Sequence, residues 1–166
     1  KINKNVVAKI IYHKSTDKKH FSLKKKRFRG QIKPDSGQME TNLCQIDSRN
    51  EKIVEIINKI RINDPRRKIL VLSNRKIHLD LLKEDVDNLI DMDIAAGIIE
   101  EDEYFTCYYT GDSKTSERAD AEEKGDIIFA TYQMAHEGLD IKHLNTVILA
   151  SPKKDVTQSI GRVMRK

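Results

Sequence analysis

The arrangement of short apolar blocks constrains the fold of this chain more than any other feature of its sequence. Residues 68–73, 126–130 and 146–150 are runs rich in Ile, Leu, Val, Phe and Ala, and each is followed by polar residues. Short uninterrupted runs of this kind are typical of strands buried on both faces of a parallel sheet. Residues 105–110 and the β-branched residues 5–12 are predicted to form two further strands.

Helical patterns separate these blocks. We predict helices over residues 50–63, 76–91 and 115–124, and a last helix from residue 156 onward. The expected inward faces are Ile53, Ile56, Ile57 and Ile60 in the first helix, and Ile77, Leu81, Leu82, Val86 and Leu89 in the second. Strands that alternate with helices imply right-handed crossovers, so the expected fold is α/β, with a mostly parallel central sheet and helices on both faces.

Ligands of such sheets bind at the carboxyl ends of the strands. Ser73, Gly111, Thr131 and Ser151 lie at four of these predicted ends. The most distinctive pattern follows the last of them, where Gln158, Arg162 and Arg165 share one face of the predicted final helix. Forked guanidinium groups match phosphate oxygens two hydrogen bonds at a time, so this face is suited to phosphate chemistry.

At these residues the sequence resembles the C-terminal RecA-like lobe of a superfamily 2 helicase. The run Gln158-x-x-Gly161-Arg162-x-x-Arg165 matches motif VI of that superfamily, and residues 131–140 match its motif V. The resemblance covers roughly residues 40–166 and extends the expected fold to a RecA-like three-layer domain. It is strongest for DNA helicases of large DNA viruses and phages, a group that includes the poxvirus transcript-release helicase and the phage branch-migration helicase.

The resemblance implies roles at the nucleotide. Arg165 would be an arginine finger, Arg162 a second contact to the γ-phosphate, and Gln158 a contact to that phosphate or to the attacking water. Gly138, Asp140 and Glu137 of motif V would lie at the nucleotide, although Glu137 is equally able to hydrogen-bond within its own loop. The alternatives are a basic helix end that favours the helix dipole and an ordinary glycine turn with a helix cap.

The resemblance also implies contacts to the phosphates of a nucleic acid. These would come from Ser73, Asn74 and Arg75 at motif IV, from Gly111 in a short Thr-x-Gly element, and from Thr131 of motif V. The alternative for the first group is a helix N-cap at Ser73 or Asn74.

No Gly-x-x-x-x-Gly-Lys-Ser/Thr run occurs in the sequence, so nothing in it matches a P-loop. A first lobe carrying the P-loop and the Mg²⁺ carboxylates is therefore expected outside this chain, with ATP bound between the two lobes. The acidic residues 100–103 are predicted to be a solvated connector rather than a magnesium site, and the histidines and cysteines match no metal-ligand spacing. The isolated chain is expected to be inactive as an ATPase.

A basic surplus is confined to the first third of the chain. Residues 1–50 hold 13 Lys and Arg against 4 Asp and Glu, whereas the whole chain has a net charge of +5. We treat residues 13–40 as an insertion within one domain of residues 1–166, with a β-hairpin around residues 21–32. Lys24, Lys25, Lys26 and Arg27 are its candidate nucleic-acid contacts, and the alternative is a solvated lysine-rich loop.

The expected function is thus the second motor lobe of an ATP-dependent DNA helicase or translocase, which is an enzyme only together with its first lobe. Its partners would be nucleic acid, DNA rather than RNA, and that lobe. The rival is a non-catalytic α/β nucleic-acid-binding module. Two distant cysteines, Cys44 and Cys107, indicate a reducing intracellular compartment, and a viral protein would act in the host cytoplasm or be carried in the virion. The chain begins at Lys1, which we take to indicate a fragment.

Overall fold

The computed structural model describes residues 7–141 and 143–156. Its centre is a sheet of four parallel strands in the order β4-β5-β3-β6. These strands are β3 (Lys68–Ser73), β4 (Thr106–Tyr109), β5 (Ile127–Thr131) and β6 (Leu144–Leu149). The apolar blocks therefore form a parallel sheet as the sequence predicted, because strands buried on both faces need apolar residues at every position.

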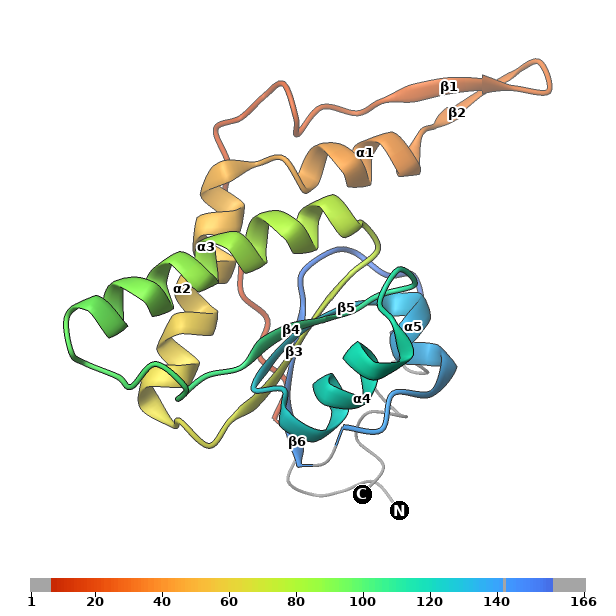
Figure 1. Ribbon diagram of the computed structural model, residues 1–166. Coiled ribbons are helices and arrows are strands. Elements are labelled where there is room, and N and C mark those ends of the chain that lie inside the picture. Colours follow the sequence, from red (N-terminus) through yellow and green to blue (C-terminus); the bar gives the residue numbers. More distant parts are fainter. Residues whose placement is uncertain (1–6, 142, 157–166) are drawn as a thin grey trace.

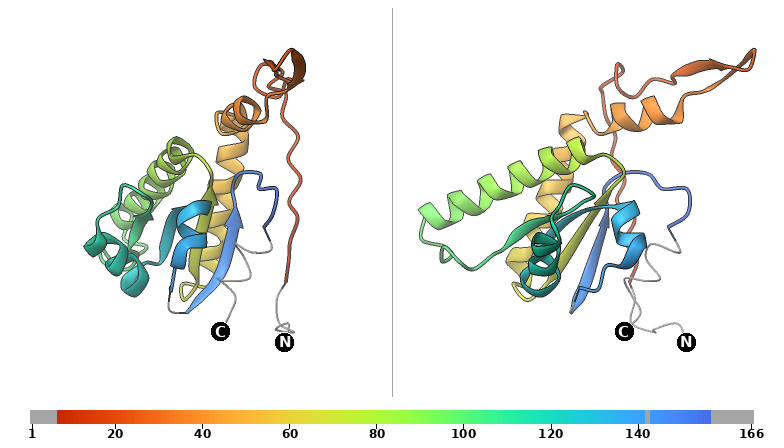
Figure 2. Two further views of the ribbon diagram at one scale, coloured as in Figure 1. Left: turned by 90° about the vertical axis from the view of Figure 1, so that its right-hand side faces the viewer. Right: turned by 45° about the vertical axis from the view of Figure 1, so that its right-hand side comes forward.

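Helices cover both faces of this sheet (Figures 1 and 2). Alternate residues of β3 enter different cores. Ile69 and Val71 pack with α2 (Asp47–Asn63) and α3 (Lys76–Ala95), and Leu70 and Leu72 pack with α4 (Thr115–Lys124) and α5 (Tyr132–Gly138). This arrangement confirms the three-layer α/β fold.

Helix α3 corrects part of the predicted inward face. Leu79, Leu82, Val86 and Ile90 are its buried apolar residues. Ile77 and Leu81 were expected to face inward, but they are 57% and 39% exposed. Each lies two positions from Leu79, which is about 200° around a helix, so both belong to its opposite side. The predicted face included these two residues and left out Leu79 and Ile90, which are both buried, so that face was only partly correct.

Helix α5 was not predicted. The sequence analysis treated residues 131–140 as a polar loop, whereas Tyr132–Gly138 form a short helix. The Thr131 hydroxyl accepts a hydrogen bond of 3.4 Å from the backbone N–H of Met134 and so caps the first turn. A threonine before the run Tyr-Gln-Met-Ala is a recognisable cap signal.

The N-terminal third differs most from expectation. The predicted strand over residues 5–12 is wrong for residues 7–12, which form no strand and expose Val7, Ile10 and Tyr12. These residues favour extended backbone, but a strand also needs a neighbour to pair with. The predicted hairpin is confirmed as β1 (Lys25–Phe28) and β2 (Gln31–Pro34), joined by a tight turn with positive φ at Arg29 and Gly30.

A further helix, α1 (Ser36–Leu43), follows the hairpin and was also not predicted. The Asp35 carboxylate caps it by accepting from the backbone N–H of Gln38. The sequence Pro34-Asp35 carries this start signal. Figures 1 and 2 show that the hairpin and α1 lie beyond the end of the sheet to which the strands point. None of the described helices is long and apolar enough to cross a membrane.

Candidate functional site

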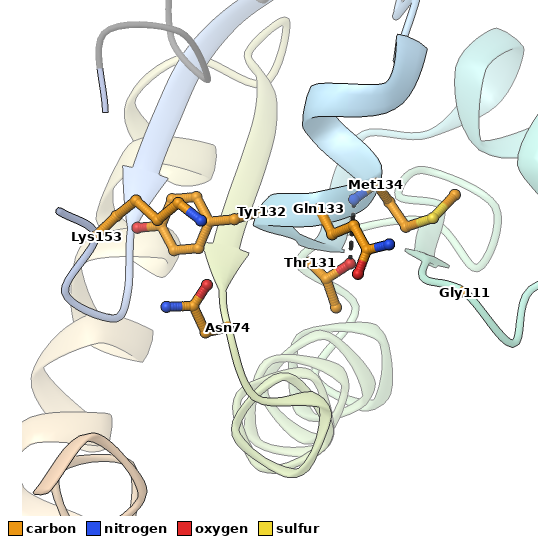
Figure 3. Close-up of a pocket in the computed structure, with 7 residues that line it drawn as sticks. All are labelled: Asn74, Gly111, Thr131, Tyr132, Gln133, Met134 and Lys153. Atoms are coloured by element: carbon orange, nitrogen blue, oxygen red, sulfur yellow. Dashed lines mark hydrogen bonds between the residues drawn. The ribbon is translucent and has the colours of Figure 1, made fainter. Parts of the chain in front are cut away.

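A pocket of about 350 Å³ opens at the carboxyl ends of the strands (Figure 3). It is lined by Asn74, Gly111, Thr131, Tyr132, Gln133, Met134 and Lys153. These residues follow β3, β4, β5 and β6, so each of the four strands contributes to it. Three predicted nucleic-acid contacts, namely Asn74, Gly111 and Thr131, are therefore brought together from segments far apart in the sequence.

Parallel pairing is the reason for this convergence. Ser73 and Thr131 are opposite each other as the last paired residues of β3 and β5. The chain leaves both strands at the same level, and the turn after each one borders the same space. At Gly111 a Cβ atom would meet no heavy atom within 4 Å. No atom therefore crowds the Cβ side of this residue, while its carbonyl accepts a hydrogen bond of 3.2 Å from Nη2 of Arg118.

The residues of the motif IV turn do not all face this pocket. The Ser73 side chain is fully buried, and its hydroxyl lies 3.0 Å from Nδ1 of His78. The other ring nitrogen, Nε2, lies 3.0 Å from Oδ1 of Asn50, whose own Nδ2 donates to the carbonyl of Cys44. The Asn50 oxygen needs a donor, so His78 carries its proton on Nε2 and accepts from Ser73 on Nδ1.

Burial, with the Arg49 cation nearby, lowers the pKa of His78 to about 4. The ring is therefore neutral at physiological pH and serves this network. The side chain of Ser73 is used inside the protein, and only its backbone remains for a ligand.

Asn74 and Arg75 are also engaged within the chain. The side-chain nitrogen of Asn74 donates to Oε1 of Glu40 at 2.6 Å and to the carbonyl of Pro152 at 3.2 Å. Its backbone N–H donates to the hydroxyl of Ser151 at 3.0 Å. Nη2 of Arg75 donates to the carbonyl of Gly37 at 3.1 Å. The contacts of Asn74 and Arg75 to phosphate stay predictions. The nitrogen atoms named above already have acceptors within the protein.

Glu40 joins α1 to the ends of two strands. Its Oε1 atom accepts from Asn74 and, at 3.2 Å, from the hydroxyl of Ser151 after β6. Its Oε2 atom lies 3.9 Å from Nη2 of Arg75. Glu40 was not among the predicted site residues. No sequence signal pointed to Glu40, because it lies in a segment that was treated as an insertion without periodicity.

Lys153 and Tyr132 are further pocket residues that the sequence analysis missed. The Lys153 ammonium lies 5.3 Å from the centre of the Tyr132 ring, and Figure 3 shows the two side chains next to each other. The buried Tyr132 hydroxyl donates to the carbonyl of Ser151 at 2.7 Å. Burial, with a contribution from Glu40, raises the pKa of Tyr132, which stays protonated. A lysine three residues after the predicted strand 146–150 was the available signal for Lys153.

The pocket combines a cation, the hydroxyl of Thr131 and the backbone at Gly111. A lysine ammonium and backbone or hydroxyl groups are the groups that proteins use to hold phosphate oxygens without reading sequence. Chemically, the site is therefore suited to a phosphate-containing strand.

The predicted nucleotide residues are only partly described. Glu137 is exposed on α5 and accepts a hydrogen bond from Nε2 of Gln133 at 2.9 Å. This is a contact within its own segment, which the sequence analysis gave as the alternative to a contact with the nucleotide. Gly138 ends α5, and Asp140 is exposed just beyond it. Gln158, Arg162 and Arg165 lie outside the described residues.

The predicted basic contacts, Lys24, Lys25, Lys26 and Arg27, lie at and beside β1 and are exposed apart from Lys24, which is half-buried. Lys26 pairs with Asp35 at 3.2 Å. The pocket and the hairpin are distinct surfaces, connected through α1.

Among residues 7–141 and 143–156, no group of three or more His, Cys, Asp or Glu side chains could hold a metal ion. The acidic residues 100–103 form a turn after α3 and belong to no such group.

Comparisons with known proteins identify the family of this chain and support its fold. Residues 48–166 match the family profile described as "Helicase conserved C-terminal domain". A "putative ATP-dependent RNA helicase" of Acanthamoeba polyphaga mimivirus is 36% identical over 167 residues, which is all of this chain and 29% of that protein. The solved structure of the C-terminal part of the Fun30 ATPase domain covers 70% of this chain and 36% of its own, with a TM-score of 0.53 and 17% identity, and supports the fold.

Proposed function

The chain belongs to the helicase conserved C-terminal domain family, and from this premise we propose that it is the second motor lobe of a superfamily 2 helicase or translocase. It spans 29% of the length of its mimivirus relative, so the activity of the whole protein is part of the proposal. In this proposal residues 1–166 form one lobe with a basic insertion at about residues 13–40. The first lobe, with the P-loop, lies elsewhere in the protein.

One observation carries the proposal: residues from three predicted motifs line a single pocket at the strand ends. Asn74, Gly111 and Thr131 are separated by long stretches of sequence, and the fold places them together with Lys153. A strand of nucleic acid held there would be bound through its phosphates, with little sequence specificity and strong dependence on salt.

The nucleotide is proposed to bind at the motif VI residues. Arg165 and Arg162 would stabilise the charge that develops on the γ-phosphate, and Gln158 would contact that phosphate or the attacking water. Gly138, Asp140 and Glu137 would complete this side of the cleft. Among the described residues no group of three or more His, Cys, Asp or Glu side chains could hold a metal ion. In this proposal Mg²⁺ and the ground-state phosphate contacts belong to the first lobe.

Lobe closure on ATP would move the arginines onto the γ-phosphate and shift the grip of the strand-end pocket along the nucleic acid. Reopening after hydrolysis would then advance the strand in one direction. The isolated chain should not hydrolyse ATP, because half of the catalytic groups are missing from it. Measurable turnover by this chain alone, abolished by a mutation within it, contradicts the two-lobe proposal.

The expectation of DNA as the substrate rests on the sequence resemblance, and the mimivirus relative is named for RNA. We therefore propose nucleic acid in general at this stage. The compartment is proposed to be a reducing one inside the cell, which for a viral protein is the host cytoplasm, or the virion.

The proposal is tested by replacing two pocket residues in the intact protein. Thr131→Val removes a hydroxyl while keeping the shape of the side chain, and Lys153→Ala removes the cation. Both should weaken binding of a single strand and its stimulation of ATPase activity. The expected loss is roughly 3–10-fold for Thr131→Val, as for a neutral hydrogen bond, and about 10-fold or more for Lys153→Ala, as for a charged one.

Lys154→Ala is the matched control, because Lys154 is exposed and lies outside the pocket lining. Unchanged binding and stimulation in both pocket variants would remove the pocket from the proposed function. Binding without any ATPase activity in the intact protein would instead favour the non-catalytic nucleic-acid-binding module.

A further inference from the structure

The side chain of Asn74 is held in one orientation by its hydrogen bonds. Its nitrogen has two hydrogens, and both have acceptors, the Glu40 carboxylate at 2.6 Å and the Pro152 carbonyl at 3.2 Å. Neither of these groups can donate a hydrogen bond. If the amide were turned over, its oxygen would face two acceptors and lose both bonds. The positions of nitrogen and oxygen are thus fixed by chemistry.

The amide oxygen is left for the pocket. Figure 3 shows the nitrogen of Asn74 pointing away from the other lining residues, and the oxygen pointing towards the side formed by Tyr132 and Lys153. None of the residues that the structure describes donates a hydrogen bond to this side-chain oxygen. Asn74 therefore offers the pocket an acceptor and no side-chain donor.

An acceptor at this place cannot bind a phosphate oxygen, which is itself only an acceptor. It can accept from a hydroxyl group. In a nucleic-acid strand whose phosphates lie against Lys153 and Thr131, the hydroxyl nearest to the backbone is the ribose 2′-OH, which RNA has and DNA lacks.

We infer that Asn74 is a specificity-determining residue, whose side-chain oxygen accepts a hydrogen bond from the 2′-hydroxyl of a bound RNA strand. Glu40 is a positioning residue in the same arrangement, because it holds the amide with its oxygen towards the pocket. This inference rests on the proposed function and deepens it, since it makes RNA rather than DNA the favoured strand.

The first experiment compares the affinities of three ligands for the unaltered protein. The intact protein is titrated with single strands of one sequence as RNA, as DNA and as 2′-fluoro RNA, which keeps an RNA-like sugar but cannot donate from the 2′ position. Unmodified RNA should bind more tightly than both others by a factor of about 2–10, as one hydrogen bond provides. Equal binding of RNA and 2′-fluoro RNA overturns the inference, with no variant that could misfold involved.

Variants then assign the effect to Asn74. Asn74→Ala should bring the affinity for RNA close to that for 2′-fluoro RNA, and Asn145→Ala should leave the ratio unchanged. Asn145 is an exposed residue of β6, at the end of the sheet opposite the pocket. An equal loss for all three ligands in Asn74→Ala contradicts the inference.

Variants of Glu40 test its role as the positioning residue. Glu40→Gln keeps an oxygen that can accept from Asn74, so the ratio should persist, whereas Glu40→Leu frees the amide to turn and should lower the ratio. A purely structural role of Glu40 would change all affinities together, and that outcome contradicts the positioning assignment. The proposed function fails separately, by the absence of any effect of Thr131→Val and Lys153→Ala on binding of any strand.

Discussion

The Glu40 carboxylate accepts a 2.6 Å hydrogen bond from the side chain of Asn74, which lies 34 residues later in the chain. The same oxygen accepts from Ser151, 111 residues later. The helix that follows the basic hairpin is thus attached directly to two of the strand ends that border the pocket. A second contact between α1 and the turn after β3 is the hydrogen bond from Nη2 of Arg75 to the carbonyl of Gly37.

Replacing the proposed arginine finger should abolish most of the motor activity. In the intact protein, Arg165→Ala should lower the nucleic-acid-stimulated ATPase rate by a factor of about 10³, because the charge on the γ-phosphate develops in the transition state. Affinity for ATP should change far less. Steady-state ATPase kinetics and nucleotide titration measure the two effects, with Lys124→Ala on α4 as the control for removal of a cation. An ATPase rate within a factor of about three of the wild type rules out the finger assignment.

Removing the hairpin cations should weaken binding to every sequence alike. With Lys24, Lys25, Lys26 and Arg27 changed to Ala, each lost phosphate contact should flatten the log–log dependence of affinity on salt by about 0.7 for single strands and about 0.9 for duplex DNA. Binding at several salt concentrations measures this slope. The control replaces Lys52 and Lys59, which flank Glu55 on α2, with Ala. An unchanged slope would mean that the hairpin is merely solvated.

A side chain at position 111 should leave the stability of the fold unchanged but weaken the binding of nucleic acid. A Cβ atom there meets nothing within 4 Å, so Gly111→Ala should leave the urea midpoint of the chain nearly unchanged. Because Gly111 lines the pocket, the added methyl group should weaken binding of a single strand several-fold by keeping the ligand from the backbone.

Gly125→Ala provides the contrast for the stability measurement. Its Cβ would lie 2.5 Å from the carbonyl oxygen of Ala121 and 2.6 Å from Cγ1 of Ile128, so overpacking should cost about 1–3 kcal/mol. Full binding by Gly111→Ala would show that no ligand approaches this turn.

Stability should fall on acidification because of His78. Burial and Arg49 lower its pKa from 6.5 to about 4, so between these two values the unfolded chain binds more protons than the folded one. The free energy of unfolding should therefore decrease as the pH falls from about 6.5 to about 4, by up to about 3 kcal/mol from this residue.

Urea unfolding of the chain at a series of pH values measures this dependence. His78→Gln should remove this part of the slope, and His143→Gln, at an exposed position before β6, should keep it. Identical slopes for wild type and His78→Gln would exclude His78 as the cause.

The sequence alone was enough for the sheet and for the place of the pocket. Uninterrupted apolar blocks such as residues 68–73 and 126–130 have no solvent-exposed face, so they must lie inside a parallel sheet. Parallel strands joined by helices bring their carboxyl ends to one edge of the sheet, so the sequence predicted Gly111 and Thr131 at the edge where ligands bind. The family motifs added the expected phosphate chemistry.

The tertiary structure decided which atoms remain for a ligand. Ser73, Asn74 and Arg75 have polar groups that the sequence offers to nucleic acid. In the fold the Ser73 hydroxyl, the Asn74 side-chain nitrogen and Nη2 of Arg75 are hydrogen-bonded to His78, Glu40 and the carbonyl of Gly37. Whether residues 7–12 become a strand likewise depends on a neighbour. Propensity and periodicity are local properties of the chain. The partner of a hydrogen-bonding group, by contrast, is decided by which groups the fold places next to it. For Asn74 that partner is the carboxylate of Glu40, 34 residues away in the sequence.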